Sequence, residues 1–510
     1  MGEPIWKRLT NRFCLWLEGY LTSVIASFVA AFCAYTFAFT NKLMCADEVE
    51  NLFAKGATIS SGRWGLEITR LIFPDVSMPW IYGIITICLL CISCCLIIDI
   101  FSITNRALRV LLPVAIITFP SLIGTFAYMF TSASYGLAFL AAVLSVYCLK
   151  NGRNIAAFLM LVFSLGIYQA YIAIAASLLL LIIIQQLILA RQELKIIIRI
   201  GAGYVLFLAL ALGVYYLIST VIVLFGEGGF NQYASVTLDP ARGVLILRPV
   251  KAYFFYVAAI LKGSFGLVQG KVSTIMHLML IGVTALCILV LMLDKARQLD
   301  NKLWLLLSLA LIPLAVNCMF LFVNEHAIHT LVLYGFAMNY VVVAVIWEAA
   351  TQTPGYSSRM KLLQEDASVL ALTVIIITNI FVANKAYLKL HLDYENTYSF
   401  FTSLIGDIKT TEGFDEESKI AIIGKTDNMT SHFEELENLG IVGITVFDLD
   451  KNNTGREKFI QRYCGFDAPF ATEDEKEWIR SQKEFLHMNE YPYYGSIAEI
   501  DDFIVVKLSD

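Results

Sequence analysis

The residues best suited to chemistry are two adjacent carboxylates, Asp47 and Glu48, which stand just after the first long apolar segment of the chain. Further charged side chains follow closely, so charge gathers here instead of being scattered. A carboxylate at a membrane face can take the proton of a hydroxyl that attacks a lipid-borne substrate. The pair is therefore our candidate general base, and the alternative is a solvated turn in which Asp47 caps a short helix.

A second candidate is the segment Ser61-Gly62-Arg63-Trp64-Gly65, with Glu67 close behind. A guanidinium matches a phosphate with two parallel hydrogen bonds, and Trp prefers the headgroup level of a membrane. The segment therefore predicts that Arg63 and Glu67 belong to a site for a lipid phosphate. The alternative is a turn with an anchoring Trp.

Other candidate contacts to a phosphate are Arg248, Lys251 and His326. His326 and His329 lie about one helical turn apart, which would suit a metal, but two ligands are too few to argue for one. We therefore predict no metal site and no cofactor and assign His326 to substrate binding, and a divalent metal is the alternative.

The composition places the chain in the membrane class. Of its 510 residues, 58% are hydrophobic and 15% are charged, and the mean hydropathy is +0.70. A soluble domain has roughly 45–50% apolar and about 25% charged residues. The net charge of −5 gives no sign of nucleic-acid binding. We predict a polytopic membrane protein whose first partner is the lipid bilayer and which binds no nucleic acid.

Apolar runs of about 20 residues are needed to cross a hydrocarbon core. About eleven segments qualify, two of which form one long apolar stretch that we divide at Gly166-Ile167-Tyr168-Gln169. They cover residues 19–40, 78–100, 107–127, 132–149, 154–168, 171–190, 199–225, 272–293, 303–322, 328–348 and 368–386. The sequence thus predicts a transmembrane domain of about 11 helices over residues 1–386.

Basic residues set the orientation of these helices. Short loops that carry Lys and Arg alternate with short loops that carry none, such as 128–134 and 168–171. Because positive charge accumulates on the cytoplasmic side, we predict that the N-terminus is inside. Two longer loops, 41–77 and 226–271, and the tail 387–510 are then outside.

The tail 387–510 predicts a small extracytoplasmic α/β domain. Runs rich in β-branched residues at 419–424, 444–447 and 503–507 are typical of strands, and helix-like stretches lie near 455–464 and 473–486.

Tyrosines recur near the short outer loops, at Tyr128, Tyr135, Tyr168 and Tyr171. Aromatic rings with a polar tip favour the membrane interface, so we expect interfacial anchors. Stacking on a sugar ring is the alternative.

Several motifs, in this order, resemble one known family. They are the acidic pair after the first span, Ser60-Ser61-Gly62-Arg63-Trp64-Gly65, Ile167-Tyr168-Gln169-Ala170, Asn384-Lys385-Ala386-Tyr387, Gly495-Ser496-Ile497 and Val505-Val506-Lys507-Leu508. Over essentially the whole chain, they resemble the bacterial GtrII-type glucosyltransferases. The resemblance implies a polytopic, α-helical membrane glycosyltransferase of the GT-C class.

The same resemblance implies an activity and its partners. Such enzymes take a sugar, here glucose, from a polyprenyl-phosphate donor and pass it to a cell-surface polysaccharide outside the bacterial cytoplasmic membrane. A donor synthase and a flippase would then act upstream. Asp47 and Glu48 correspond to acidic positions of the first outer loop, where the family often shows two aspartates, so either carboxylate is a candidate base.

The rival interpretation is a transporter or flippase for a lipid-linked glycan, and a third is a scaffold partner of a donor synthase. Carriers tend to place ionisable groups near the middle of the bilayer. Apart from span ends, Asp99 is the one acidic residue inside the expected spans, and it lies near a cytoplasmic end. The sequence therefore favours the transferase.

Overall fold

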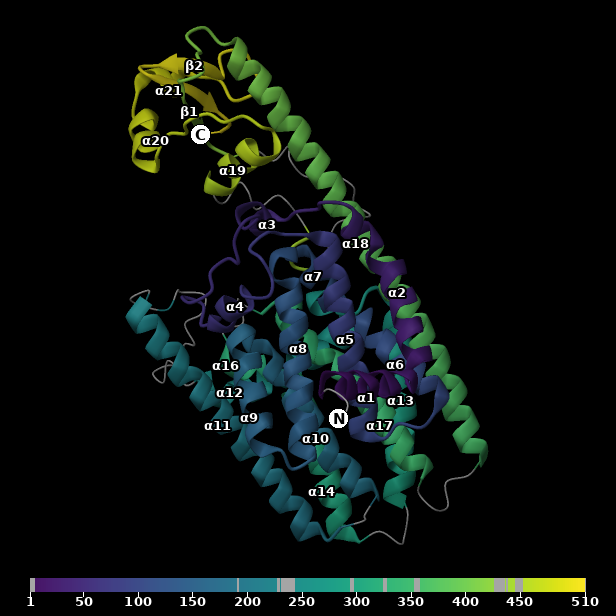
Figure 1. Cartoon of the computed structure of the whole chain (residues 1–510). Coiled ribbons are helices and arrows are strands. Elements are labelled where there is room, and N and C mark those ends of the chain that lie inside the picture. The colour runs from purple at the N-terminus through teal and green to yellow at the C-terminus, as the bar shows by residue number, and fades with distance from the viewer. Residues whose placement is uncertain are drawn as a thin grey trace. The chain divides into compact units, whose positions relative to one another are not determined.

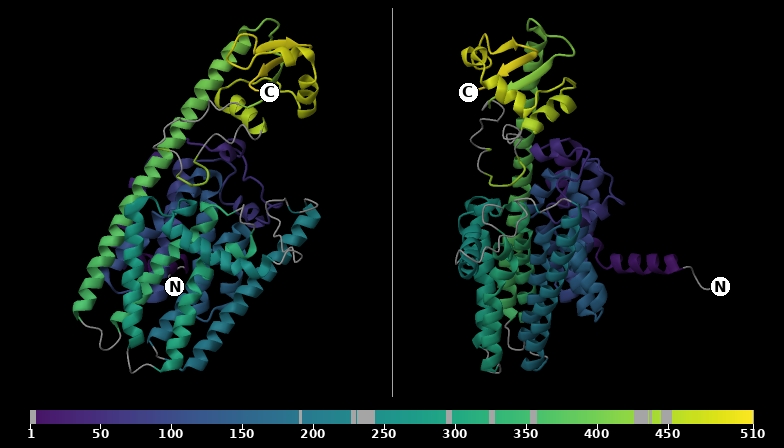
Figure 2. Two further views of the ribbon diagram at one scale, coloured as in Figure 1. Left: turned by 180° about the vertical axis from the view of Figure 1, so that it is seen from behind. Right: turned by 90° about the vertical axis from the view of Figure 1, so that its left-hand side faces the viewer.

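The computed structural model describes residues 5–189, 192–226, 230, 244–293, 298–323, 328–352, 358–425, 436, 439–444 and 453–509. The chain folds as two compact units (Figures 1 and 2). Unit 1 comprises Met1–Asn41, Ala57–Asn384 and Asn438–Val442, and unit 2 comprises Lys42–Gly56, Lys385–Glu437 and Gly443–Asp510. Each unit is therefore assembled from separate stretches of sequence.

Unit 1 is built from helices, most of them apolar. A helix satisfies its own backbone polar groups, which hydrocarbon cannot do, so apolar runs of this length fold as helices in a membrane. The helices are α1 (Ile5–Glu18), α2 (Leu21–Thr40), α4 (Trp64–Thr69), α5 (Pro79–Phe101), α6 (Arg106–Ile117), α7 (Pro120–Ala127), α8 (Met129–Lys150), α9 (Asn154–Ile167), η1 (Gln169–Tyr171), α10 (Ile172–Leu189), α11 (Leu194–Gly226), α12 (Val244–Leu261), η3 (Ser264–Gly266), α13 (Gly270–Leu293), α14 (Leu299–Ala310), α15 (Ile312–Val316), α16 (Met319–Phe322), η5 (Thr330–Ala337), α17 (Met338–Thr351) and the first part of α18 (Ser358–Thr410).

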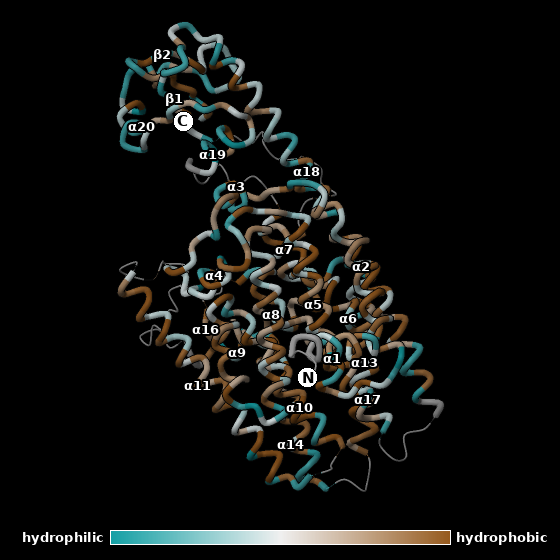
Figure 3. Tube along the Cα trace, viewed as in Figure 1, coloured by the Kyte–Doolittle hydropathy of each residue, from teal (hydrophilic) through white to brown (hydrophobic). Residues whose placement is uncertain are grey.

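Among the described residues, nine helical segments are long and apolar enough to cross a membrane, and the bent pair α6 and α7 would make a tenth. The helix α9 is also apolar but has only 14 residues. All eleven predicted segments therefore contain helix, and a multi-pass membrane protein is confirmed, while the count of eleven spans stays a prediction. Figure 3 shows the apolar residues concentrated along these helices.

The bend of 41° between α6 and α7 has an identifiable cause. Pro120 has no backbone N–H, so it cannot donate to the carbonyl four residues before it and starts a new helix instead. Two buried tyrosines donate hydrogen bonds to the carbonyls at the break. Tyr334 Oη donates to Ile116 O at 3.0 Å, and Tyr35 Oη donates to Ile117 O at 2.9 Å. The broken helix thus keeps its polar groups satisfied inside the bundle.

Asp99, the acidic residue inside the predicted second span, has a structural role. Its carboxylate accepts hydrogen bonds from Trp16 Nε1 at 2.6 Å and from Tyr20 Oη. The aromatic residues come from the end of α1 and the turn before α2, so Asp99 ties this turn to α5. These bonds give a packing reason for its presence.

Unit 2 contains a small three-stranded sheet, which confirms the predicted strands at 419–424 and 503–507. Its elements are α3 (Ala46–Glu50), the last part of α18, β1 (Lys419–Ile423), α19 (Asn453–Tyr463), α20 (Glu473–Arg480), α21 (Lys483–His487), β2 (Ile497–Ile500) and β3 (Phe503–Lys507). The strand order is β1-β3-β2, with β1 parallel and β2 antiparallel to β3. The run predicted at 444–447 lies, beyond Ile444, outside the described residues.

A buried cluster formed by the sheet, α20, α21 and the segment before α20 gives unit 2 its own core. Its members are Ala421, Ile423, Ala471, Ile479, Phe485, Ile500 and Val505. The helix α20 begins with a capping box in which Thr472 and Glu475 satisfy each other's backbone N–H groups.

The stretch 42–56 of the first predicted outer loop belongs to unit 2. The reason is local packing of α3 on α19: Arg462 Nη1 donates to Val49 O at 2.7 Å and to Glu50 O at 3.2 Å, and its guanidinium lies 5.6 Å from the centre of the Phe53 ring. The predicted end of the transmembrane domain, at residue 386, falls inside the helix α18, which continues to Thr410.

Candidate functional site

The two predicted catalytic carboxylates lie in the short helix α3 of unit 2. Asp47 and Glu48 occupy its first turn, where the positive end of the helix dipole favours negative charge. Asp47 is exposed, whereas the Glu48 side chain is fully buried. Two neighbours in sequence therefore meet different surroundings, and only Asp47 is open to a solvent-borne group.

Glu48 is held by an ion pair. Its Oε1 lies 2.5 Å from the Nζ of Lys42. Tyr463 of α19 lies nearby. Burial together with the negative charge of Glu48 raises the pKa of the Tyr463 phenol. The Tyr463 hydroxyl has no hydrogen-bond partner among the residues that the structure describes. We call Lys42, Asp47, Glu48 and Tyr463 the acidic cluster.

In unit 1, the Ser61–Gly65 segment packs directly on the Gly166–Gln169 break. A Cβ added to Gly65 would lie 2.7 Å from the carbonyl carbon of Gly166, and one added to Gly166 would lie 2.5 Å from the Trp64 ring. Both distances are shorter than real Cβ atoms show, so only glycine fits at either position. Two motifs about a hundred residues apart in sequence thus form one interface.

Hydrogen bonds lock this interface. Gln169 Nε2 donates to Ser61 O at 2.9 Å and to Tyr215 Oη at 2.7 Å, and Tyr215 Oη donates to Gly62 O at 3.2 Å. Gly62 adopts φ of +69°, in the left-handed region that favours glycine. The loop before α4 is therefore fixed by contacts to η1 and α11.

This loop positions the guanidinium of Arg63. Its centre lies 5.3 Å from the centroid of the Tyr168 ring, and Nη1 donates to Tyr135 Oη at 3.3 Å. The two tyrosine rings stack on each other with centroids 4.3 Å apart. His329 is near enough for burial and the charge of Arg63 to lower its pKa to about 4. We call Arg63, Tyr135, Tyr168 and His329 the Arg63 cluster.

The Arg63 cluster carries one fixed positive charge at neutral pH. His329 is then neutral, since its lowered pKa lies well below 7, and it offers hydrogen bonds without repelling the guanidinium. The aromatic wall orients the half-buried arginine through cation–π contact. Such a group is suited to bind an anionic oxygen, such as that of a phosphate.

The remaining predicted residues take separate places. Glu67 forms an ion pair with Arg70 at 2.5 Å and accepts a hydrogen bond from Thr58. Arg248 lies on α12, where Nη1 donates to Leu321 O at 3.1 Å, and Lys251 follows on the same helix. His326 lies outside the described residues.

The expectation that the tyrosines are interfacial anchors is wrong for three of them. Tyr135, Tyr168 and Tyr171 are each at most 2% exposed and pack inside the bundle. Two of them build the Arg63 cluster, a role that the sequence analysis missed together with those of Gln169, Tyr215 and His329. The motif Ile167-Tyr168-Gln169-Ala170 was the available signal, because it places a polar break inside an apolar stretch.

Within the described parts of the chain, no group of three or more His, Cys, Asp or Glu side chains is arranged to hold a metal ion. The chemistry that the two clusters can offer is proton transfer by a carboxylate and binding of an anion by a guanidinium.

Comparisons with known proteins add the family. Searches of curated proteins and of solved structures found no match. A family model described as "Glucosyl transferase GtrII" matches residues 36–340, which is more than half of the chain and includes both clusters' motifs at 47–48 and 61–65. This result confirms the resemblance drawn from the sequence. The chain belongs to the GtrII family of glucosyl transferases.

Proposed function

We propose that this glycosyltransferase moves glucose from a polyprenyl-phosphate donor to a cell-surface polysaccharide outside the bacterial cytoplasmic membrane. The observation that carries the proposal is the match to a glucosyl transferase family in a chain of multiple apolar helices. A sugar donor carried by lipid suits an enzyme whose largest part is built for a membrane. The bilayer and the glycan acceptor are then its partners, and a donor synthase and a flippase act upstream.

In the proposed reaction, the acceptor hydroxyl oxygen attacks the anomeric carbon of glucose while the bond from that carbon to the phosphate oxygen breaks. The hydroxyl proton passes to a carboxylate, and polyprenyl phosphate departs with the electron pair of the broken bond. Attack opposite the leaving group inverts the anomeric configuration. We assign the base role to Asp47, because it is exposed, and we assign Glu48 to support of α3 through its ion pair with Lys42.

Departure of a phosphate leaves negative charge that a cation stabilises. Arg63 is our candidate for this role in unit 1, because the Tyr168 ring and the docked glycines hold its guanidinium in place. Arg248 and Lys251 are further candidates on α12. Glu67, four residues after Arg63, stays a candidate substrate contact.

Sidedness is part of the proposal. The basic turns favour an N-terminus inside the cell, and an odd number of spans then leaves the second, sheet-containing unit outside. An exposed α/β domain there would be available to hold a polymeric acceptor.

The function is tested with the purified full-length protein in detergent. Radiolabelled glucose on undecaprenyl phosphate is incubated with candidate surface glycans, with the free nucleotide sugar as the control donor. Label should move to a glycan only from the lipid-linked donor. Transfer from the nucleotide sugar instead, or translocation of the lipid-linked sugar without transfer when the same protein is reconstituted into vesicles, would contradict the proposal.

A further inference from the structure

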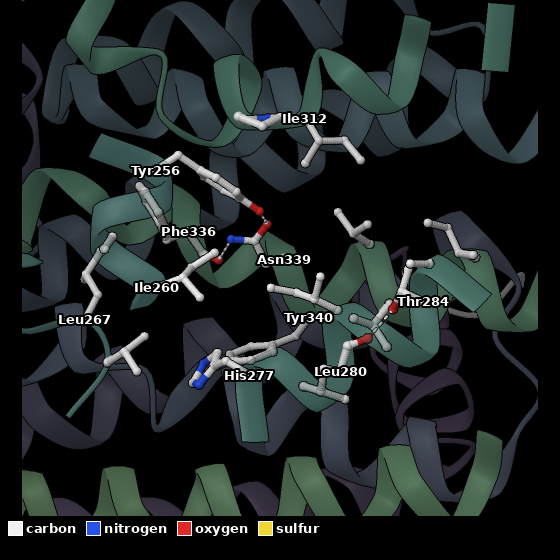
Figure 4. Close-up of a pocket in the computed structure, with 18 of the residues that line it drawn as sticks. Tyr256, Ile260, Leu267, His277, Leu280, Thr284, Ile312, Phe336, Asn339 and Tyr340 are labelled. Atoms are coloured by element: carbon white, nitrogen blue, oxygen red, sulfur yellow. Dashed lines mark hydrogen bonds between the residues drawn. The ribbon is translucent and has the colours of Figure 1, made fainter. Parts of the chain in front are cut away.

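A cavity of about 260 Å³ lies within unit 1, bounded by α12, α13, α15, η5 and α17 (Figure 4). Its wall is mostly aliphatic, with the rings of Tyr256, Phe336 and Tyr340 among the lining groups. On the α13 side, Ile281 is 45% exposed, so the cavity opens along the surface of an apolar helix. An occupant can therefore enter from hydrocarbon.

The polar groups of the wall are already used. Tyr256 Oη donates to Asn339 Oδ1 at 2.8 Å, and Asn339 Nδ2 donates to Phe336 O at 2.9 Å (Figure 4). His277 Nε2 lies 3.1 Å from Tyr340 Oη. Thr284 Oγ1 donates within its own helix. Because these side chains satisfy one another, the wall suits a hydrocarbon and not a polar ligand.

The cavity is connected to the Arg63 cluster by a single element. The helix η5 begins one residue after His329 and carries Phe336, which lines the cavity. At ~2.0 Å per residue in a 3₁₀-helix, the backbone advances by at most about 14 Å between these two positions. The cavity therefore lies no farther than this from His329 of the Arg63 cluster, a separation that the first few isoprene units of a lipid held by its phosphate at Arg63 are long enough to span.

We infer that this cavity binds the phosphate-proximal isoprenoid units of the lipid donor. A cavity of about 150 Å³ is known to hold one benzene molecule, so by proportion 260 Å³ holds about ten carbon atoms, or two isoprene units. The methyl branches of isoprene units can pack on the aromatic rings of the wall, whereas an unbranched acyl chain has no such groups. The inference rests on the proposed function, since it takes the donor to be a polyprenyl phosphate.

Two filling substitutions test the inference. Ala285 lines the cavity at an exposed position of α13, and Val343 lines it from α17. Ala285→Trp and Val343→Phe should each weaken binding of undecaprenyl phosphate to the purified full-length protein at least tenfold, since burial of about two CH₂ groups is already worth a factor of ten. Leu286→Trp is the matched control, because Leu286 is exposed on the same helix and does not line the cavity.

Dioleoyl phosphatidic acid separates an isoprenoid site from a general lipid site, because it presents a phosphate monoester on acyl chains without methyl branches. Parental protein should bind it more weakly than undecaprenyl phosphate, and neither filling variant should change that weak binding. Equal affinity for the two lipids, or unchanged binding of undecaprenyl phosphate in whichever filling variant folds, overturns the inference.

If glucose transfer from the lipid donor persists with an unchanged KM in these variants, the inference fails and the proposed function stands. If parental protein shows no transfer from that donor, the proposed function fails.

Discussion

Burial separates the roles of Asp47 and Glu48, although the two are adjacent and chemically alike. Glu48 is buried and pairs with the partly exposed ammonium of Lys42, whereas Asp47 is exposed on α3. A base that meets an incoming hydroxyl must be reachable, while a buried carboxylate is better suited to hold its helix in place.

Asp47→Asn should therefore lower the rate of glucose transfer by roughly 10²–10⁴-fold, because it removes the proton acceptor but keeps the shape of the side chain. Glu48→Gln should instead lower the stability of unit 2 by about 1–3 kcal/mol, because the charge that the buried carboxylate brings to its ion pair with Lys42 is lost. Initial rates and thermal unfolding of both purified variants measure the two effects. If both variants transfer glucose at the parental rate, the acidic cluster is only structural.

Arg63→Lys tests the donor site, since it keeps the charge but loses the planar fork and its stacking on Tyr168. We expect KM for the lipid donor to rise about tenfold or more, as for loss of one charge-assisted hydrogen bond. Arg70→Lys is the matched control, because Arg70 is exposed and pairs with Glu67 and Asp75. Equal donor KM in the two variants would exclude Arg63 from the site.

The sequence predicted which residue types could act, but not their surroundings. Arg63 stood out because an arginine beside a tryptophan is unusual in an apolar chain. Its partners Tyr135 and His329 did not, because each is separated from it by a long stretch of sequence and aromatic residues near loops usually anchor at the interface. Burial of a carboxylate such as Glu48 depends on tertiary packing and has no local signal.

At the scale of elements, the fit between α4 and α9 is sensitive to change. Gly166→Ala places a methyl group against the Trp64 ring and should destabilise the bundle by about 1–3 kcal/mol. Gly203→Ala, in the helix α11 with open space around it, should be neutral or stabilise by up to about 1 kcal/mol. Thermal unfolding in detergent compares the two, and equal midpoints would show that the close packing is not required.

Helices were predictable from the sequence because their signal is local and long. The break at Gly166-Ile167-Tyr168-Gln169 was also visible and is confirmed as the end of α9 and the start of η1. The strand β2 was missed. It has only four residues and pairs with β3 alone, so the hydrophobic alternation that marks a strand is too short to detect.

At the scale of the whole molecule, sidedness can be measured by cysteine labelling in intact cells. Exposed Cys14 and Cys33 are first replaced by Ser. A membrane-impermeant maleimide should then label Ser481→Cys, which lies between α20 and α21. It should not label Asn151→Cys in the turn after α8. The reason is that the loop at Asn151 is basic and the spans between place the sheet-containing unit on the other side. The opposite labelling pattern would reverse the orientation.

The composition of unit 2 could not be predicted from the sequence. Residues 42–56 follow the first span closely, so a reader of the sequence assigns them to the membrane part. Arg462, which contacts α3, lies 413 residues after Val49 in the sequence. Only the folded structure shows that α3 belongs to unit 2.

This discontinuity has a consequence for biosynthesis. At translation rates of roughly 5–20 residues per second, a ribosome needs about 20–80 s to pass from Val49 to Arg462. During this interval α3 exists on the nascent chain without α19 beneath it, while the helices encoded in between are inserted and packed. The acidic cluster is therefore completed late in translation, and a ribosome that stalls before α19 leaves a largely formed bundle without a finished Asp47 site.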